Sequence, residues 1–478
     1  RARSVPPSEL VVADLLYDGL TAYDPAVGQA VPALASGWET DEAATTWRFT
    51  LDPDAAFTDG APVRPEDVKA SLERVAAAGP AEPAARLLSG IIGSDEVASG
   101  AATTLAGVSL EGEDVVVIAL AEPLSSFPEL LASPLLGIAP EGATADSLDA
   151  LPAGSGPFRL AAGSSGEDGM LASDVIRLER APGAAAIVDG VDLVLAEDSV
   201  GALALVEAGD ADVAYVPSEV GELDGDLDEV AAPSGAELFY GLNLRSPKLA
   251  DPRLREAIVA AVDQDAISDG VYGANLGPLA GVVPDDVPGG APGGCGAPCR
   301  HDPDRARALV SEAFPHGDAP ELFVDVDSGS RQEQVAAAIV SDLEAVGIPA
   351  SVRTHAIDEY PSFLASGQQE VFRLGWSGGW ASAAAYLAPL FRSGSPENVV
   401  GLSVPAVDDA LDRAAAEREP ATRDAAYVEA EALVLAEMPV LLIGQFRTRV
   451  AVGDTVRGLE LSVTGTFDAT RIHLARDR

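Results

Sequence analysis

The residues whose types and spacing could do chemistry gather at a short turn, residues 375–379. Its Gly-Trp-Ser-Gly-Gly sequence satisfies the G-x-S-x-G pattern, in which a serine between a strand and a helix acts as a nucleophile. Asp408 or Asp409 and then His473 follow in the order acid, histidine that such hydrolases use. A Ser377 nucleophile with His473 as its base would define a serine hydrolase.

This hydrolase pattern is weak on its own. In a chain with 47 glycines, G-x-S-x-G arises by chance in roughly one sequence in four. No His-Gly-Gly segment for an oxyanion hole precedes the turn. The histidines have neither metal nor triad spacing; they are His301, His316, His355 and His473. We therefore expect no metal, no cofactor and no enzyme, and we keep the serine hydrolase as the alternative.

The same turn also has the composition of a ligand-binding surface. Trp376 and Trp380 offer flat faces for stacking, and Ser377, Gly378 and Gly379 between them leave backbone N–H and C=O groups accessible. We predict that these five residues contact a ligand. The alternative is that the tryptophans are ordinary core residues.

Four further side chains are candidate ligand contacts. Tyr240 and Asn243 stand at the end of a predicted strand, and Tyr386 lies on the helix after the turn. Arg331 opens a predicted helix, where its guanidinium could meet a ligand carboxylate. Each has a structural alternative, such as a core position for Tyr240 or a solvated helix end for Arg331.

The two cysteines, Cys295 and Cys299, stand in a loop rich in Gly and Pro. In an oxidising compartment they would form a local disulfide, which we predict. Free thiols or a metal site with His301 are the alternatives, although a zinc site needs more ligands.

Charge and length limit the classes of protein. With 30 basic and 76 acidic residues the net charge is −46, so we expect no nucleic-acid partner and no binding to anionic lipid. A chain of 478 residues indicates several domains. Nearly all basic residues are arginines, with only Lys69 and Lys248 as lysines, which indicates a GC-rich genome such as that of an actinobacterium.

The hydropathy pattern predicts neither a membrane span nor a signal segment. No apolar run approaches the roughly 18 residues needed to span a bilayer. The chain opens without an apolar signal segment, so it is either cytosolic or a mature or trimmed secreted form.

The elements that must position these residues follow from periodicity. Alternation predicts a half-buried strand at 46–51, and turn residues predict a hairpin at 108–120 and a β-α-β unit at 191–216. From 302 to 446 strands alternate with helices, with strands at 322–326, 350–354, 371–376 and 440–446. The pattern predicts an α/β protein with open, mixed sheets.

Several stretches in order resemble one family, the family 5 extracellular solute-binding proteins. The matching segments are Leu16-Tyr17-Asp18-Gly19-Leu20, Pro32–Trp38, Trp47–Leu51, Phe57–Val63, Gly154–Phe158, Pro252–Ile258 and Gly375-Trp376. This group includes oligopeptide-, dipeptide- and nickel-binding receptors of ABC importers. The resemblance runs over roughly residues 10–450.

The resemblance implies a two-lobed periplasmic-binding-protein-like fold with a two-strand hinge. Lobe I would comprise 1–22, 151–243 and 440–478, with an inserted subdomain at 23–150, and lobe II would be 244–439. The hinge crossings would lie at 243–245 and 438–441. Closure of the lobes around a peptide or other small molecule would present it to the ABC permease. The family also implies a monomer outside the cytoplasmic membrane, with an N-terminal lipid anchor.

One position departs from the family pattern. In peptide-binding members this turn resembles W-x-x-D, and its Asp pairs with the free amino group of the peptide. Gly379 occupies that position here, and no carboxylate replaces it within the turn. The departure implies that a free N-terminus is not held in the usual way, and it favours an uncharged ligand, a blocked peptide or a sugar.

Overall fold

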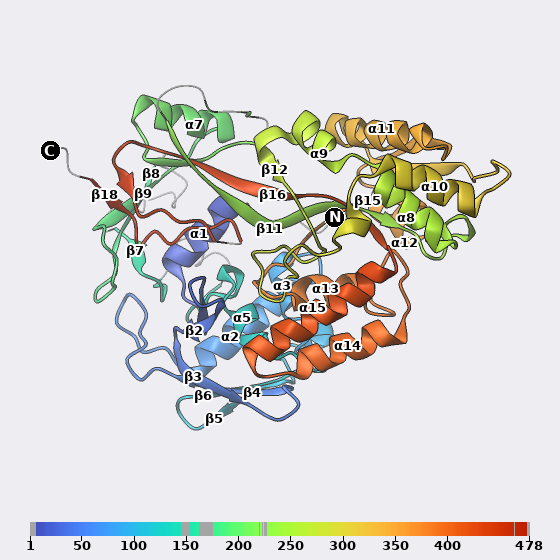
Figure 1. The fold of residues 1–478 in the computed structure, drawn as a ribbon. Coiled ribbons are helices and arrows are strands. Elements are labelled where there is room, and N and C mark those ends of the chain that lie inside the picture. The colour runs from blue at the N-terminus through green and yellow to red at the C-terminus, as the bar shows by residue number, and fades with distance from the viewer. Residues whose placement is uncertain are drawn as a thin grey trace. The chain divides into compact units, whose positions relative to one another are not determined.

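The computed structural model describes residues 6–144, 153–161, 175–218, 220–221, 223, 227–462 and 464–475 (Figure 1). Residues 233–447 form one compact unit, which we call the central unit. The residues up to 232 and from 448 form another, which we call the flanking unit. No helix among the described residues is long and apolar enough to cross a membrane.

The chain passes between the units within two long strands, β11 (Asp228–Leu242) and β16 (Val440–Val452). The expected crossings at 243–245 and 438–441 lie at the other ends of these strands. Both strands are longer than their apolar segments. Strand β11 includes Pro233, and β16 includes Arg447-Thr448-Arg449. The alternation of side chains did not predict a strand at these positions. The assignment of 23–150 as an inserted subdomain stays a prediction.

The central unit is built on a mixed sheet. Its remaining elements are α8 (Pro252–Ala261), α9 (Gln264–Ile267), β12 (Leu276–Gly277), α10 (Pro303–Ala313), β13 (Leu322–Asp327), α11 (Ser330–Ala345), β14 (Ala350–His355), α12 (Tyr360–Ala365), β15 (Val371–Ser377), α13 (Ala384–Phe391), α14 (Pro405–Ala416) and α15 (Pro420–Ala436). Strand β13 pairs in parallel with β14 and β15, whereas β15 pairs antiparallel with β11. The predicted mixed α/β sheet is confirmed.

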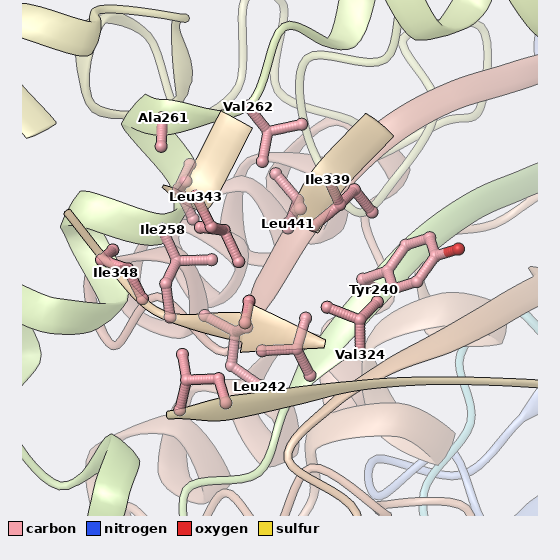
Figure 2. Packing of buried hydrophobic residues seen from close by; sticks show 14 of the residues in the cluster. Tyr240, Leu242, Ile258, Ala261, Val262, Val324, Ile339, Leu343, Ile348 and Leu441 are labelled. Carbon is pink, nitrogen blue, oxygen red and sulfur yellow. The ribbon is translucent and has the colours of Figure 1, made fainter. Parts of the chain in front are cut away.

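One face of this sheet carries the hydrophobic core of the central unit (Figure 2). Alternate residues of β11, Leu238, Tyr240 and Leu242, pack with Ile258 of α8 and Ile339 of α11. Each buried Leu or Ile stabilises the fold by roughly 1.5–3 kcal/mol. The helices begin where the sequence provides caps, as at Asp302, whose Oδ1 accepts the Arg305 N–H at 3.0 Å.

The flanking unit contains smaller sheets. Its elements are α1 (Pro7–Leu16), β1 (Thr21–Asp24), β2 (Gln29–Pro32), β3 (Ala35–Thr40), β4 (Thr46–Leu51), α2 (Pro65–Ala77), α3 (Pro83–Leu87), α4 (Ser94–Ala98), β5 (Val108–Glu111), β6 (Val115–Ala119), α5 (Phe127–Leu131), β7 (Phe158–Leu160), β8 (Val175–Arg180), β9 (Gly190–Val194), α7 (Ser199–Ala208), β10 (Val213–Tyr215), β17 (Val456–Arg457) and β18 (His473–Leu474). The predicted hairpin is confirmed as β5 and β6, joined through Gly112 at a φ of 67°.

The predicted β-α-β unit at 191–216 is wrong. Strand β9 pairs antiparallel with β8, and β10 pairs antiparallel with β16, so the two strands lie in different sheets. A β-α-β unit needs parallel strands in one sheet. The local pattern correctly predicted β9, β10 and the helix between them. It could not predict which strands they pair with, because the partner of β10 lies far away in the sequence.

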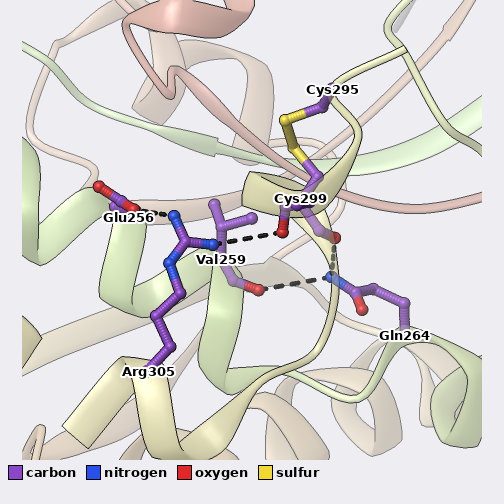
Figure 3. Close-up of a disulfide and its surroundings, with 7 residues drawn as sticks. Glu256, Val259, Gln264, Cys295, Cys299 and Arg305 are labelled. Atoms are coloured by element: carbon purple, nitrogen blue, oxygen red, sulfur yellow. Dashed lines mark hydrogen bonds and ion pairs between the residues drawn. A yellow bond between two sulfur atoms is a disulfide. The ribbon is translucent and has the colours of Figure 1, made fainter. Parts of the chain in front are cut away.

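A disulfide joins Cys295 and Cys299 within the loop before α10 (Figure 3). Gln264 Nε2 donates to the Cys299 carbonyl at 3.4 Å, and Arg305 Nη1 donates to the Ala297 carbonyl at 3.2 Å. Arg305 also pairs with Glu256 of α8. The disulfide loop is therefore held by hydrogen bonds from α9 and α10.

Candidate ligand-binding site

The predicted ligand-binding turn lies at the end of β15. Trp376 is half-buried, and its indole Nε1–H donates to the Ala385 carbonyl at 2.8 Å, which fixes the ring against α13. Ser377 is exposed and is the last residue of the strand. Trp380 is half-buried, and its buried Nε1–H has no hydrogen-bond partner among the described residues.

The two glycines of the turn serve different purposes. A Cβ on Gly378 would lie 2.6 Å from Cε2 of Tyr386, so only glycine lets that ring pack against the turn. Gly379 is exposed and has a φ of 77°, a left-handed conformation that most residues avoid. Gly378 therefore allows the Tyr386 ring to pack against the turn. Gly379 allows the left-handed backbone conformation that the turn needs.

Tyr386 and Asn243 already bond to the protein backbone. The Tyr386 hydroxyl donates to the Gly235 carbonyl at 2.7 Å, and burial followed by the nearby Glu237 raises the pKa of its phenol. Asn243 Nδ2 donates to the Gly367 and Gln369 carbonyls at 3.1 and 2.7 Å, and its Oδ1 accepts the Arg245 N–H at 3.1 Å. These bonds give both side chains a structural role, and their ligand contacts stay predictions.

Tyr240 belongs to a different group of polar side chains, on the core face of the sheet. It stands directly opposite Arg373 in the β11–β15 pairing, so the two side chains share one face. Figure 2 shows its hydroxyl pointing away from the surrounding apolar side chains. This hydroxyl finds no hydrogen-bond partner in the part of the chain that the structure describes.

Two arginines, an aspartate and a second tyrosine complete this group. Arg373 Nη1 lies 3.4 Å from Oδ1 of Asp327, which is fully buried at the end of β13. The Arg331 guanidinium lies 5.3 Å from the ring centre of Tyr272, a cation–π distance. Burial raises the pKa of the Tyr272 phenol, and the positive charges of Arg373 and Arg331 oppose that rise.

We call Tyr240, Tyr272, Asp327, Arg331 and Arg373 the arginine cluster. It contains two guanidinium groups and one carboxylate. Within the described ranges, the Tyr240 hydroxyl and the Arg373 Nε–H both lack hydrogen-bond partners. Positive charge together with unbonded donors is the arrangement that binds a carboxylate.

Glu237 lies on the opposite face of the same strand. It stands opposite Trp376 in the strand pairing and is 1 % exposed. Neither carboxyl oxygen has a hydrogen-bond partner among the residues that the structure describes. Burial, and then the nearby Glu431, raise the pKa of this carboxyl well above its ordinary value.

The residues of the hydrolase alternative have other structural positions. Ser377 belongs to the central unit, whereas His473 is an exposed residue of β18 in the flanking unit. Asp408 on α14 accepts the Ser393 N–H at 2.8 Å. No group of three or more His, Cys, Asp or Glu side chains in the described residues is arranged to hold a metal ion.

The structure thus brings the predicted residues into two groups. Trp376, Gly378 and Tyr386 meet at the end of β15, while Tyr240 and Arg331 belong to the arginine cluster. Glu237, Tyr272, Asp327 and Arg373 were not predicted from the sequence. The available signal was an ionisable residue inside an apolar strand, as in Val371-Phe372-Arg373-Leu374 and Glu237-Leu238-Phe239-Tyr240.

These features define a class: an α/β protein of two units joined by two strands, with buried polar groups that have no hydrogen-bond partner among the described residues. Solved structures agree on the fold. The unliganded open form of the periplasmic murein tripeptide binding protein MppA matches with a TM-score of 0.85 at 21% identity, covering 99% of this chain and 94% of that one. HbpA2 from Haemophilus parasuis matches with a TM-score of 0.81 at 20% identity, covering 99% and 97%. The fold is that of the periplasmic binding proteins.

The family model "Bacterial extracellular solute-binding proteins, family 5 Middle" matches residues 29–398, and the chain belongs to this family. The glutathione-binding protein GsiB of Salmonella typhi is 26% identical over 450 residues, covering 90% of this chain and 83% of the relative. The probable di/tripeptide-binding protein 5 of Pseudomonas aeruginosa is 24% identical over 493 residues, covering 97% and 91%. The chain is a solute-binding protein of an ABC-type importer and not an enzyme, and the hydrolase alternative finds no support.

Proposed function

We propose that the solute is a short peptide or peptide-like compound with a free carboxylate. The observation that carries this proposal is the arginine cluster, where Arg373 pairs with Asp327, Arg331 lies over the Tyr272 ring, and the Tyr240 hydroxyl has no hydrogen-bond partner among the described residues. A carboxylate would accept hydrogen bonds from these donors and balance their charge.

Support also comes from the names of the relatives. One is named for glutathione, which is itself a tripeptide with free carboxylates, and the other for di- and tripeptides. In this proposal Trp376 and Trp380 pack against the apolar parts of the solute. Exposed Ser377 and Gly379 leave the backbone of the turn open to hydrogen bonding.

The proposal extends to the setting of the protein. The chain would act as a monomer outside the cytoplasmic membrane, held there by an N-terminal lipid, and deliver its solute to a permease. A disulfide at Cys295–Cys299 is consistent with an oxidising compartment. The lipid anchor and the monomeric state rest on the family resemblance.

Calorimetric titration with glutathione and with di- and tripeptides tests the proposal. Each peptide is compared with its C-terminal amide, and an oligosaccharide serves as an unrelated solute. We expect a free carboxylate to raise affinity by about tenfold or more. Equal affinity for acids and amides, or binding of the oligosaccharide alone, would contradict the proposal.

The variant Tyr240→Phe localises the effect. It removes a hydroxyl that has no partner among the described residues, so the free energy of unfolding should not fall. Affinity for the free acids should fall by about threefold to tenfold, and affinity for the amides should stay unchanged. A loss of the same size for acids and amides would show that the hydroxyl does not contact the carboxylate.

A further inference from the structure

The carboxyl group of Glu237 lies in the interior of the protein without a partner. Its residue is 1 % exposed, and within the described residues neither oxygen accepts a hydrogen bond. Buried polar groups in folded proteins are nearly always hydrogen-bonded, so an unbonded carboxyl needs a physical reason. An isolated buried carboxylate is stable only when it takes up a proton or meets a cation.

Among the described residues, the charged groups that act on Glu237 and on the nearby Tyr386 are acids. Glu431 on α15 lies near it, and the Glu431 oxygens accept the backbone N–H groups of Val283 and Ala291 at 2.9 and 3.3 Å. The Tyr386 hydroxyl on α13 donates to the Gly235 carbonyl. Asp286, which also lies near Tyr386, accepts a hydrogen bond from Gln445 at 2.7 Å.

The Tyr386 hydroxyl and the Gln445 amide therefore donate to other acceptors, the Gly235 carbonyl and the Asp286 carboxylate. Among the described residues, the charged group that acts on the Glu237 carboxyl is another acid. A positive group that reached this position would meet the unbonded Glu237 carboxyl, with the acid Glu431 nearby. Such a site selects an ammonium or guanidinium group.

The position of Glu237 links it to the predicted ligand-binding turn. Its cross-strand partner is Trp376, and the next residue, Ser377, is exposed at the end of β15. Tyr240 and Arg373 lie on one face of this strand pair, and Glu237 and Trp376 lie on the other. A solute that reached both faces would cross the end of β15 at the exposed residues Ser377 and Gly379, the second of which has no side chain to block it.

We propose that Glu237 is the counter-charge for an ammonium or guanidinium group of the bound solute. The proposal rests on the proposed function, and it makes the solute zwitterionic, with its carboxylate at the arginine cluster. In the unliganded protein the Glu237 carboxyl holds a proton. Binding of the cation moves that proton to the buffer, and the carboxylate pairs with the positive group. Glu237 thereby supplies the counter-charge that residue 379 lacks.

The test uses pairs of tripeptides that differ by one cation: free against acetylated N-terminus, and lysine against acetyl-lysine. Wild type should prefer the cationic member of at least one pair. Glu237→Gln keeps the shape of the side chain but not its charge, so affinity for that member should fall by about tenfold or more. Affinity for the neutral member should stay within about twofold. If Glu237→Gln keeps the preference, or if wild type prefers the neutral member of every pair, the proposal is overturned.

Proton release is the second readout. With wild type, the binding enthalpy of the cationic member should depend on the ionisation enthalpy of the buffer, and Glu237→Gln should lose that dependence. The matched control is Glu431→Gln, whose oxygens already accept backbone N–H groups. This variant should lower the free energy of unfolding, and it should weaken the binding of both peptides of a pair to the same extent.

A further arm separates this proposal from the proposed function. Thermal shifts are measured with agmatine and with sodium, potassium and ammonium chlorides. If no peptide binds but agmatine stabilises wild type and not Glu237→Gln, the peptide assignment fails while the counter-charge role of Glu237 stands. If the salts stabilise wild type through Glu237 and the peptide pairs do not differ, the site takes an inorganic cation and the proposal is overturned.

Discussion

At the residue scale, the absence of a side chain at Gly379 has consequences for both conformation and charge. The residue is exposed and left-handed, and aspartate tolerates that conformation better than most residues. Gly379→Asp should therefore fold, and it should place a carboxylate in the turn. Calorimetric titration should show about tenfold tighter binding of free-amine tripeptides, with no gain for their N-acetylated forms.

A neutral substitution controls for changes in the shape of the turn. Gly379→Asn imposes a similar conformation without the charge, so it should leave the ratio of affinities for free-amine and acetylated peptides at the wild-type value. If Gly379→Asp also leaves that ratio unchanged, the turn does not contact the amino group of the solute.

Single functional residues could be predicted from the sequence when their side chains differed clearly from those of their neighbours. The tryptophans of the turn and Tyr240 were found because aromatic residues beside glycines or at strand ends are informative. Glu237 and Arg373 were missed because a lone charge in a strand also fits a residue on a solvent-facing side. Only the strand pairing, which buries both faces at Glu237, distinguishes the two cases.

At the element scale, the contact between the turn and α13 depends on Gly378. In Gly378→Ala the new Cβ would meet the Tyr386 ring, so the ring or the turn must shift. We expect a loss of about 1–3 kcal/mol in the free energy of unfolding, measured by urea denaturation. Gly379→Ala, which adds a methyl group at an exposed left-handed position, should cost only about 1 kcal/mol. Equal losses in both variants would show that packing against Tyr386 is not the limiting constraint.

The disulfide loop offers a second test at this scale. Cys295 and Cys299 are separated by 4 positions, so the bridge closes a very short loop. Replacing both residues by serine should cost about 2 kcal/mol, because a short loop loses little entropy on closure. The hydrogen bonds from Gln264 and Arg305 to this segment should persist. Thermal unfolding of the oxidised protein and the double variant measures the effect, and a loss of global folding would mean that the bridge does more than close this loop.

Elements with strong local periodicity were the most predictable. The strand predicted at 46–51 from alternating side chains is β4, in which Trp47, Phe49 and Leu51 are buried. Strand pairing was not predictable in the same way, because β9 and β10 find partners outside their own neighbourhood. The passages between the units fall in polar parts of β11 and β16, where the pattern gave no strand signal.

At the scale of the whole molecule, the dominant feature is the net charge of −46. Self-repulsion of such a charge opposes the compact state, and salt screens it. Several buried acids with raised pKa values also make the folded state less stable when they lose their protons. Burial, and then Asp14, raise the pKa of Asp18 from 3.8 to about 7. Burial also raises the pKa of Glu431 above its ordinary value, as it does for Glu237.

The sign of the pH dependence follows from these directions. An acid with a raised pKa binds more protons in the folded state than in the unfolded state, so its contribution to stability decreases as pH rises from about 4 to about 7. Loss of protons from the other acids increases the repulsion over the same range. We therefore expect the midpoint of thermal unfolding to be at least about 3 °C higher at pH 5.5 than at pH 8 in low salt. At pH 8, 0.5 M potassium chloride should recover part of the difference. Asp18→Asn, which cannot ionise, should reduce the slope with pH, and a midpoint that rises with pH would contradict the assignment of buried, protonated acids.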